Sequence, residues 1–131
     1  MAKRQRRWVW VRQLAPEQKV AIAAACERVI ADSLKPRFVL EGGSDSCGPL
    51  AIFGKWRASK YSFIAGYRDD RGAEFDAAFA RLDHAEECLD EVRFDVMWPR
   101  HTGQWWRLHS CVTLEKALRL IATEPLLNPP L

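Results

Sequence analysis

The sequence lacks the features that would place it in a membrane. It has no apolar run approaching the roughly twenty residues that a transmembrane helix needs. Its N-terminus is basic, but no apolar segment follows the basic residues, so no signal peptide is expected. The four cysteines occur singly, without a Cys-x-x-Cys pair. Single cysteines in a chain without a secretion signal predict reduced thiols and a protein of the cytoplasm.

Catalytic motifs are missing as well. The chain has no Ser-centred nucleophile elbow, dinucleotide-binding fingerprint, phosphate loop or metalloprotease helix. Active sites can assemble from residues distant in sequence, but no motif identifies one here, so an enzyme is not the expected class. No cofactor or metal site is expected either. The residues able to ligate a metal are scattered, and only the fold could unite them: His84, Cys88, His101, His109 and Cys111.

What the chain does contain is enough apolar residues to build a core. Of its 131 residues 48% are hydrophobic, and they include six Trp and six Phe. This composition predicts a packed domain over residues 13–131 that needs no disulfide or metal. The net charge of +3 is concentrated at one end, because residues 1–12 carry five basic residues and no acidic one. Residues 13–131 hold 15 basic and 17 acidic residues, a net charge of −2.

Residues 1–12 form a basic arm that also contains tryptophan. Cationic side chains can bind phosphates and indole rings can stack on bases, so the arm predicts nucleic-acid binding. The residues expected to take part are Lys3, Arg4, Arg6, Arg7, Trp8, Trp10 and Arg12. The alternative interpretation is a solvated basic tail followed by an ordinary edge strand over residues 8–12, where Trp and Val alternate.

A helix is predicted near each end of the domain. Pro16 suits a first helical position, and an apolar stripe that includes Cys26 predicts a helix over residues 16–34. The stripe position favours a buried Cys26 rather than a nucleophile. Pro36 is expected to end this helix and to be followed by a short strand over residues 37–41.

The second helix follows the last predicted strand. Thr113 is a suitable N-cap, and the apolar spacing after it predicts a helix over residues 114–124. Pro125 is expected to stop this helix.

Two hairpins are predicted between the helices. In the first, over residues 50–68, placing Trp56 opposite Tyr61 aligns the apolar residues of both strands on one face. Several cations lie near its turn and offer a second candidate surface for an anionic ligand: Lys55, Arg57 and Lys60. The more ordinary interpretation is that these charges are solvated at a turn.

The second hairpin, over residues 93–112, organises the rest of the chain. Its expected register places Val96 opposite Trp106, Phe94 opposite Leu108 and Asp95 opposite Arg107. The four apolar residues of these pairs are expected in the core. The other face and the loop are predicted to form a partner surface made of Arg93, Met97, Arg100, His101, Trp105, Arg107 and His109.

Periodicity does not decide residues 74–89, where the apolar residues fit a helix slightly better than a strand. The segment FARLDH, a strand ending in Trp98, a polar turn, Trp105-Trp106 and a Leu-rich closing helix resemble a small bacterial family of domains of unknown function. The resemblance covers about residues 73–122 and implies that residues 74–82 are a strand. The family brings no known activity or site residues, and the basic arm is not part of its pattern.

Together these features predict an α+β fold. The expected architecture is an antiparallel sheet of five or six strands with the helices of residues 16–34 and 114–124 on one face. The expected function is that of a small non-catalytic binding protein that contacts nucleic acid through the arm. The alternative is a protein-interaction module that uses the Trp/Arg face of the 93–112 hairpin.

Overall fold

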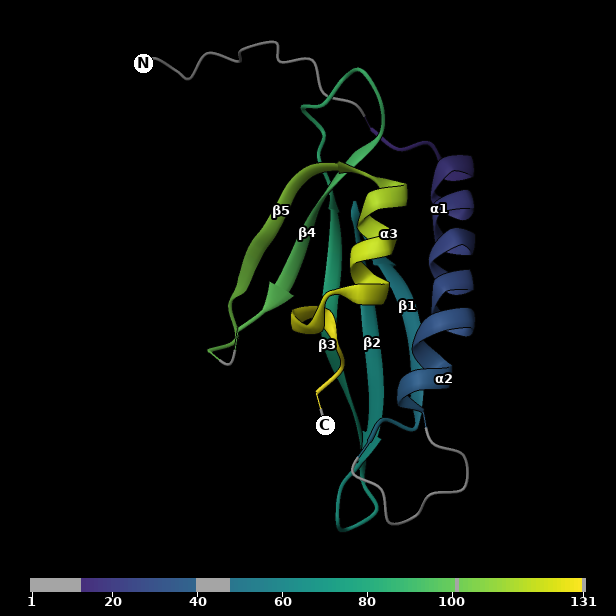
Figure 1. The fold of residues 1–131 in the computed structure, drawn as a ribbon, viewed down its shortest axis with the longest axis vertical. Coiled ribbons are helices and arrows are strands. Elements are labelled where there is room, and N and C mark those ends of the chain that lie inside the picture. Colours follow the sequence, from purple (N-terminus) through teal and green to yellow (C-terminus); the bar gives the residue numbers. More distant parts are fainter. Residues whose placement is uncertain (1–12, 40–47, 101, 131) are drawn as a thin grey trace.

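The computed structural model describes residues 13–39, 48–100 and 102–130. The elements in chain order are α1 (Pro16–Val29), the π-helical turn η1 (Ile30–Leu34), α2 (Lys35–Phe38), β1 (Ala51–Arg57), β2 (Lys60–Arg68), β3 (Glu74–His84), β4 (Arg93–Pro99), β5 (Trp105–Thr113), α3 (Leu114–Thr123) and the 3-10 turn η2 (Pro125–Leu127) (Figure 1). The strands form one antiparallel meander in the order β1-β2-β3-β4-β5. The predicted α+β class is confirmed, with five strands in the part that the structure describes.

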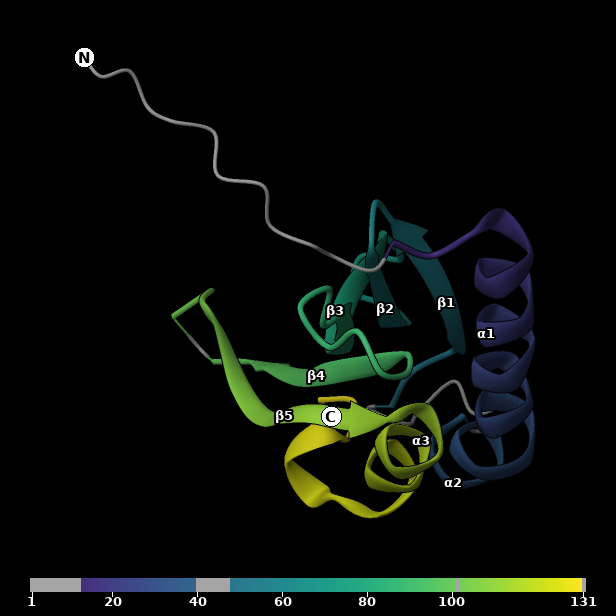
Figure 2. The same ribbon diagram turned by 90° about the horizontal axis from the view of Figure 1, so that it is seen from above.

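The helices cover one face of the sheet. Helix α1 packs on β1, and α3 packs on β4, β5 and α1 (Figure 2). The opposite side of the sheet is called the open face below. No helix among the described residues is long and apolar enough to cross a lipid bilayer.

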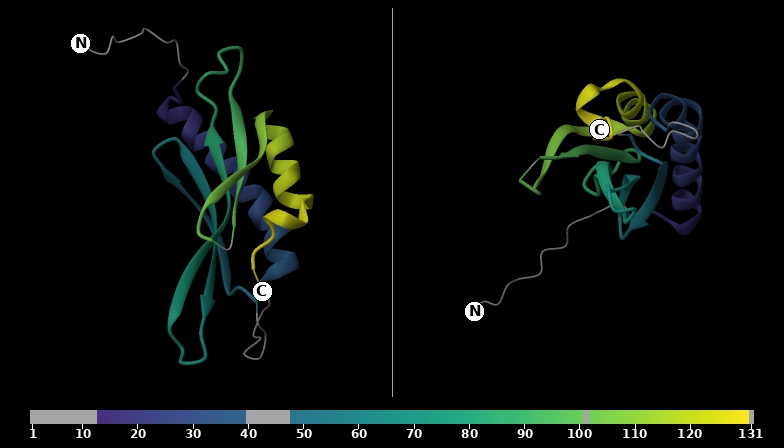
Figure 3. Two further views of the ribbon diagram at one scale, coloured as in Figure 1. Left: turned by 90° about the vertical axis from the view of Figure 1, so that its left-hand side faces the viewer. Right: turned by 90° about the horizontal axis from the view of Figure 1, so that it is seen from below.

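The sheet forks between β3 and β4. Strand β3 pairs with β2 over the whole length of β2, but it pairs with β4 only at Arg81–His84. Beyond that junction the tip of the β4–β5 hairpin diverges from the β2–β3 turn, as Figures 1 and 3 show. The fold therefore consists of two blades, β1–β2–β3 and β4–β5, joined by four residue pairs.

The core lies between the sheet and the helices. Helix α1 and its continuation contribute a stripe of residues four apart, Ile22, Cys26, Ile30 and Leu34. The sheet contributes mainly aromatic rings, among which Tyr61 packs edge-on against Phe63. The ring of Tyr61 also occupies the space above Gly54, where a Cβ atom would overlap it. Only glycine fits at this position without a shift of the ring.

The predicted end of the first helix is wrong. The chain continues as η1 and then α2 through Phe38, so no strand begins at residue 37. The π-helical turn explains why Pro36 is tolerated, because the N–H of Lys35 bonds to the carbonyl of Ile30, five residues back, and the wider turn relieves the crowding ahead of the proline ring. The rest of the expected strand, residues 40–41, lies outside the described residues.

Three other local predictions hold. The expected register of the first hairpin, with Trp56 opposite Tyr61, is confirmed. The Thr113 side chain caps α3 by accepting a 3.2 Å hydrogen bond from the N–H of Lys116, as predicted. Cys26 is fully buried, and burial raises the pKa of its thiol to about 12.

Residues 74–84 form a strand, which confirms the strand that the family resemblance implied for residues 74–82 and overturns the helix that periodicity favoured. Periodicity is misleading here because the strand contains a β-bulge. Phe63 pairs with Ala80 and Ile64 with Ala78, which leaves Phe79 as an extra residue in β3. The buried side of the strand changes at Phe79, so its apolar residues follow neither a period of two nor a regular helical stripe.

The predicted register of β4 and β5 is wrong by two positions. The structure pairs Met97 with Arg107 and Trp98 with Trp106, and two irregularities shift the register again around Val96. Phe94 and Val96 are fully buried as expected, and Leu108 packs against the core. Trp106 was expected in the core, but 48% of its surface is exposed. The cause is the fork, which carries the tip of the hairpin beyond the helices.

The expected reduced state of the cysteines is corrected for one pair. Cys88, in the connection between β3 and β4, forms a disulfide with Cys111 in β5, and their Cα atoms lie 7.0 Å apart. Cys111 has a positive φ of 51°, within an irregular part of β5. Cys111 thus lies at a local backbone irregularity that residue spacing does not reveal. Cys26 has a free thiol.

Candidate nucleic-acid interface

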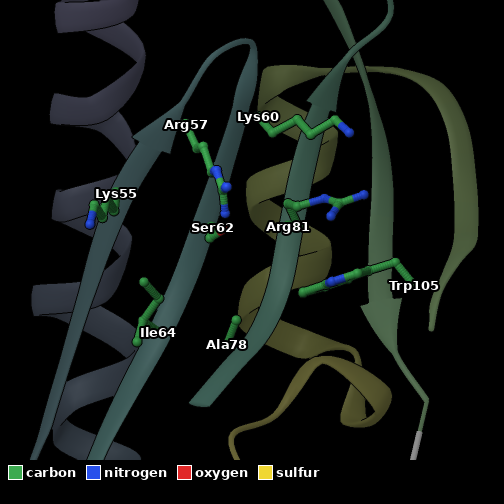
Figure 4. Close-up of a pocket in the computed structure, with 8 residues that line it drawn as sticks. All are labelled: Lys55, Arg57, Lys60, Ser62, Ile64, Ala78, Arg81 and Trp105. Atoms are coloured by element: carbon green, nitrogen blue, oxygen red, sulfur yellow. The ribbon is translucent and has the colours of Figure 1, made fainter. Parts of the chain in front are cut away.

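The open face carries a pocket of about 340 Å³ at the mouth of the fork (Figure 4). Its walls come from three adjacent strands and from the first residue of β5. The lining residues are Lys55, Arg57, Lys60, Ser62, Ile64, Ala78, Arg81 and Trp105.

The strand registers explain why these residues share a face. Alternate residues of a strand point to the same side of a sheet, so Lys55 and Arg57 point away from the helices while Trp56 points toward them. Lys55 lies opposite Ser62, which in turn lies opposite Arg81. One row of side chains therefore crosses the blade from β1 to β3. The bulge in β3 places Ala78 opposite Ile64 and completes the floor of the pocket.

Trp105 closes the pocket from the second blade. It lies opposite Pro99, near the tip of the β4–β5 hairpin, and its side chain points from β5 toward β3 (Figure 4). The guanidinium carbon of Arg81 lies 4.5 Å from the centroid of the indole ring. Arg81 is fixed in turn by Asp83, which accepts bonds of 2.6 Å from Nε and 2.9 Å from Nη2. One face of the Trp105 indole is thus covered by the guanidinium of Arg81, whose position is fixed by Asp83.

The pocket is electropositive. Four of its lining residues are cations and none is acidic. The charge of Arg81 is offset by Asp83, but none of the ion pairs formed among the described residues includes Lys55, Arg57 or Lys60. These three side chains are therefore available to bind an anion.

The lining also divides by polarity. Ile64, Ala78 and Trp105 offer apolar surface, while Lys55, Arg57, Lys60 and Ser62 form the two register pairs of the open face nearest the β1–β2 turn. Such a pocket can accept a flat apolar group and an anionic group at the same time. A nucleotide carries both groups, the first in its base and the second in its phosphate.

The predicted partner surface is divided between several positions. Arg107 lies opposite Met97 on the open face, and its Nε is 3.7 Å from a carboxylate oxygen of Asp95. Trp105 enters the pocket. The expected pairing of Asp95 with Arg107 is thus present as an ion pair, although the two residues are not register partners.

The remaining residues of that predicted surface have other contacts. Arg93 pairs with Glu91 at 2.7 Å and donates a hydrogen bond to the carbonyl of Cys111 at 3.2 Å, so it ties the β3–β4 connection to β5. His109 is half-buried opposite Val96. Arg100 lies with the rings of Trp98 and Trp106. His101 and the whole predicted arm, residues 1–12, lie outside the described residues.

Sequence reasoning found the cations of the first hairpin but not their neighbours. Lys55, Arg57 and Lys60 line one pocket, whereas Trp56 and Tyr61 of the same hairpin point into the helix-covered side. Arg81 and the apolar floor were missed. The strand that the family resemblance implied for residues 74–82 could have revealed them. Pairing this strand with β2 would have brought Arg81 onto the open face.

The scattered metal-binding candidates do not assemble in the part of the chain that the structure describes. No three His, Cys, Asp or Glu side chains there come together as a metal site would require. His84 is buried and its ring lies 5.9 Å from that of Phe94. Cys88 and Cys111 are bonded to each other.

The fold and the pocket define a small α+β domain with a cationic open face. A family model described as DUF3024, a domain of unknown function, matches residues 11–127, and the chain belongs to this family. The resemblance inferred over residues 73–122 is therefore confirmed as membership of an uncharacterised domain family, and the match extends to almost the entire domain. No curated protein and no solved structure matches the chain.

Proposed function

We propose that this protein is a non-catalytic nucleic-acid-binding module that holds a single strand on its open face. The observation that carries the proposal is the pocket at the fork, which Trp105 lines together with Lys55, Arg57 and Lys60, three cations that form no ion pair among the described residues. Proteins that bind single strands combine a cationic groove for the phosphates with aromatic rings for the bases. The pocket supplies both.

The basic arm supports the same function. Residues 1–12 add five cations and two tryptophans to a domain whose own net charge is −2. A domain with that charge depends on local cationic clusters to bind a polyanion, and the arm would extend the contact along the strand. We place this function in the cytoplasm of a bacterial cell, the compartment expected from the sequence and the origin implied by the family resemblance, although the Cys88–Cys111 disulfide does not follow from that location.

The test is a titration of labelled single- and double-stranded oligonucleotides at two salt concentrations. Single strands are expected to bind more tightly than duplexes and more tightly at low salt than at high salt. Log K falls with log salt, and each lost phosphate contact is expected to reduce the steepness of that fall by about 0.7. The double substitution Arg57→Gln with Lys60→Gln removes two exposed cations of the pocket. A matched control, Lys116→Gln with Arg119→Gln, removes one Lys and one Arg from the exposed side of α3.

The pocket variant is expected to lose affinity and salt dependence, while the control keeps most of both. No binding at low salt would overturn the proposal, and so would an equal loss in the two variants. Neutralising Arg6 and Arg7 in the full chain tests the contribution of the arm in the same assay.

A second candidate function is protein interaction through the hairpin tip. Trp106 is 48% exposed and stacks on Arg100, whose guanidinium carbon lies 4.3 Å from the ring centroid. Exposed Trp beside Arg is typical of interface hot spots. If the tip is an interface between copies, light scattering after gel filtration will detect an oligomer, and Trp106→Ala will weaken it without lowering the melting temperature.

A further inference from the structure

We infer that the pocket at the fork is a nucleotide site, in which the base contacts Trp105 and the apolar floor while the phosphate contacts the cations of β1 and β2. The inference rests on the proposed function and states which chemical unit the open face recognises. It is carried by the division of the pocket lining into an apolar and a cationic half.

The size of the pocket limits the ligand to one nucleotide at a time. Its volume of about 340 Å³ lies at the lower end of the roughly 300–1,000 Å³ that small-ligand pockets span. A duplex does not enter such a space, and its bases are already stacked and paired. Extruding a base from a duplex costs its stacking and pairing, so a free nucleotide or a flexible single strand is expected to bind the pocket more readily.

The Arg81–Trp105 contact prepares the stacking surface. Asp83 holds Arg81 by two hydrogen bonds, and Arg81 covers one face of the indole. A base would therefore stack on the other face, next to Ala78 and Ile64. Because the ring is already fixed, little side-chain entropy is lost when the base binds.

The phosphate half is built by the β1–β2 hairpin. Arg57 and Lys60 are register partners directly beside the turn, and Lys55 and Ser62 are the next pair on the same face. Three cations and one hydroxyl thus line the half of the pocket nearer the β1–β2 turn, and we assign the phosphate to this half. Arg57 supplies a planar fork of donors that suits phosphate oxygens.

The experiment is an NMR titration of the full chain with adenosine monophosphate, adenosine and inorganic phosphate in separate arms. Adenosine monophosphate is expected to saturate and to shift the amides of residues 55–62 and 78–81 and the indole signal of Trp105. Adenosine and phosphate are each expected to bind at least tenfold more weakly, since each fills only half of the pocket. Equal affinity for adenosine monophosphate and phosphate would overturn the base contact.

Two variants separate the halves. Trp105→Leu keeps apolar bulk but removes the stacking ring, so it should abolish the preference for adenosine monophosphate over phosphate and leave phosphate binding unchanged. The control is Trp106→Leu, at the adjacent position outside the pocket, which should keep that preference. Arg57→Gln, at an exposed position, should weaken both anions in similar proportion and serves if Trp105→Leu fails to fold.

Competition with a single-stranded oligonucleotide distinguishes this inference from the function on which it rests. Displacement of the strand by adenosine monophosphate supports both. Strand binding without any shift of the pocket amides overturns the nucleotide site and leaves nucleic-acid binding intact. Nucleotide binding without strand binding supports the site, identifies a free nucleotide as its ligand, and overturns the strand function. Absence of all binding overturns both.

Discussion

The guanidinium of Arg81 lies over the indole of Trp105, 4.5 Å from the ring centroid, although their strands, β3 and β5, are not neighbours in the sheet. The contact bridges the fork because β4, which lies between them, pairs with β3 over only four residue pairs. The side chains thus replace backbone pairing at the place where it stops. This contact both joins the two blades and shapes the pocket.

A double-mutant cycle can measure the strength of that bridge. We expect Arg81→Gln and Trp105→Ala to show a coupling energy of about 0.5–1 kcal/mol in urea unfolding, the usual range for a partly exposed cation–π contact. Trp106 stacks on Arg100 and not on Arg81. The same cycle between Arg81 and Trp106 should therefore give a coupling energy near zero. Equal coupling in both cycles would contradict the bridge.

Gly54→Ala is expected to destabilise the domain by about 1–3 kcal/mol, the range for overpacking a core. The reason is steric, because the added Cβ would overlap the ring of Tyr61, which is fully enclosed. Gly66→Ala is the matched control in the neighbouring strand, where the nearest atom would be a carboxylate oxygen of Asp76 at 3.3 Å. Thermal and urea unfolding should show a clearly smaller loss for Gly66→Ala.

The disulfide should make stability depend on redox conditions. Cys88 and Cys111 are 23 residues apart, and closing a loop of that size stabilises a fold by about 3 kcal/mol in the chain-entropy model. Adding a reductant is therefore expected to lower the urea midpoint. The variant with Ser at both positions should unfold at the reduced midpoint with or without reductant, and a response in that variant would assign the effect to another cysteine.

Alkaline pH should destabilise the fold through Cys26. Burial raises the pKa of its thiol from the ordinary value of 9.0 to about 12, so the folded state holds the proton more tightly than the unfolded state. Its contribution to stability is complete below pH 9 and is lost as the pH rises from about 9 to about 12. Burial also raises the pKa values of Tyr61 and Tyr67, which act in the same direction.

The measurement is the urea midpoint as a function of pH, with Cys26→Ala as the comparison. The variant should lose part of the alkaline decline, while the tyrosine contribution remains. Identical declines in the two proteins would show that Cys26 does not contribute.

The sequence predicts those elements that are decided locally. The register of β1 and β2 follows from alternation and a short turn, and the cap of α3 follows from one side chain, Thr113. The predictions that failed depend on backbone irregularities. A π-helical turn carries the first helix through Pro36, a bulge at Phe79 obscures the period of β3, and two further irregularities shift β5 against β4.

The candidate site was predictable only in part for the same reason. The cations of β1 and β2 are close in sequence and were found as a cluster. Arg81 and Trp105 meet them only because the sheet forks, and the fork results from how few residues β3 and β4 share. No periodicity within either strand specifies where their pairing ends.

The fork also makes the pocket a mechanical element. Trp105 belongs to the β4–β5 blade and the other lining residues belong to the β1–β2–β3 blade, so a ligand in the pocket would contact both blades. Bending the sheet at the four residue pairs that join β3 to β4 would move Trp105 relative to the other lining residues, and a bound ligand would restrict that bending. Amide hydrogen exchange at Arg81–His84 and Phe94–Met97 should therefore slow on binding. The exchange rates at this β3–β4 junction would then measure how much of the protein has ligand bound.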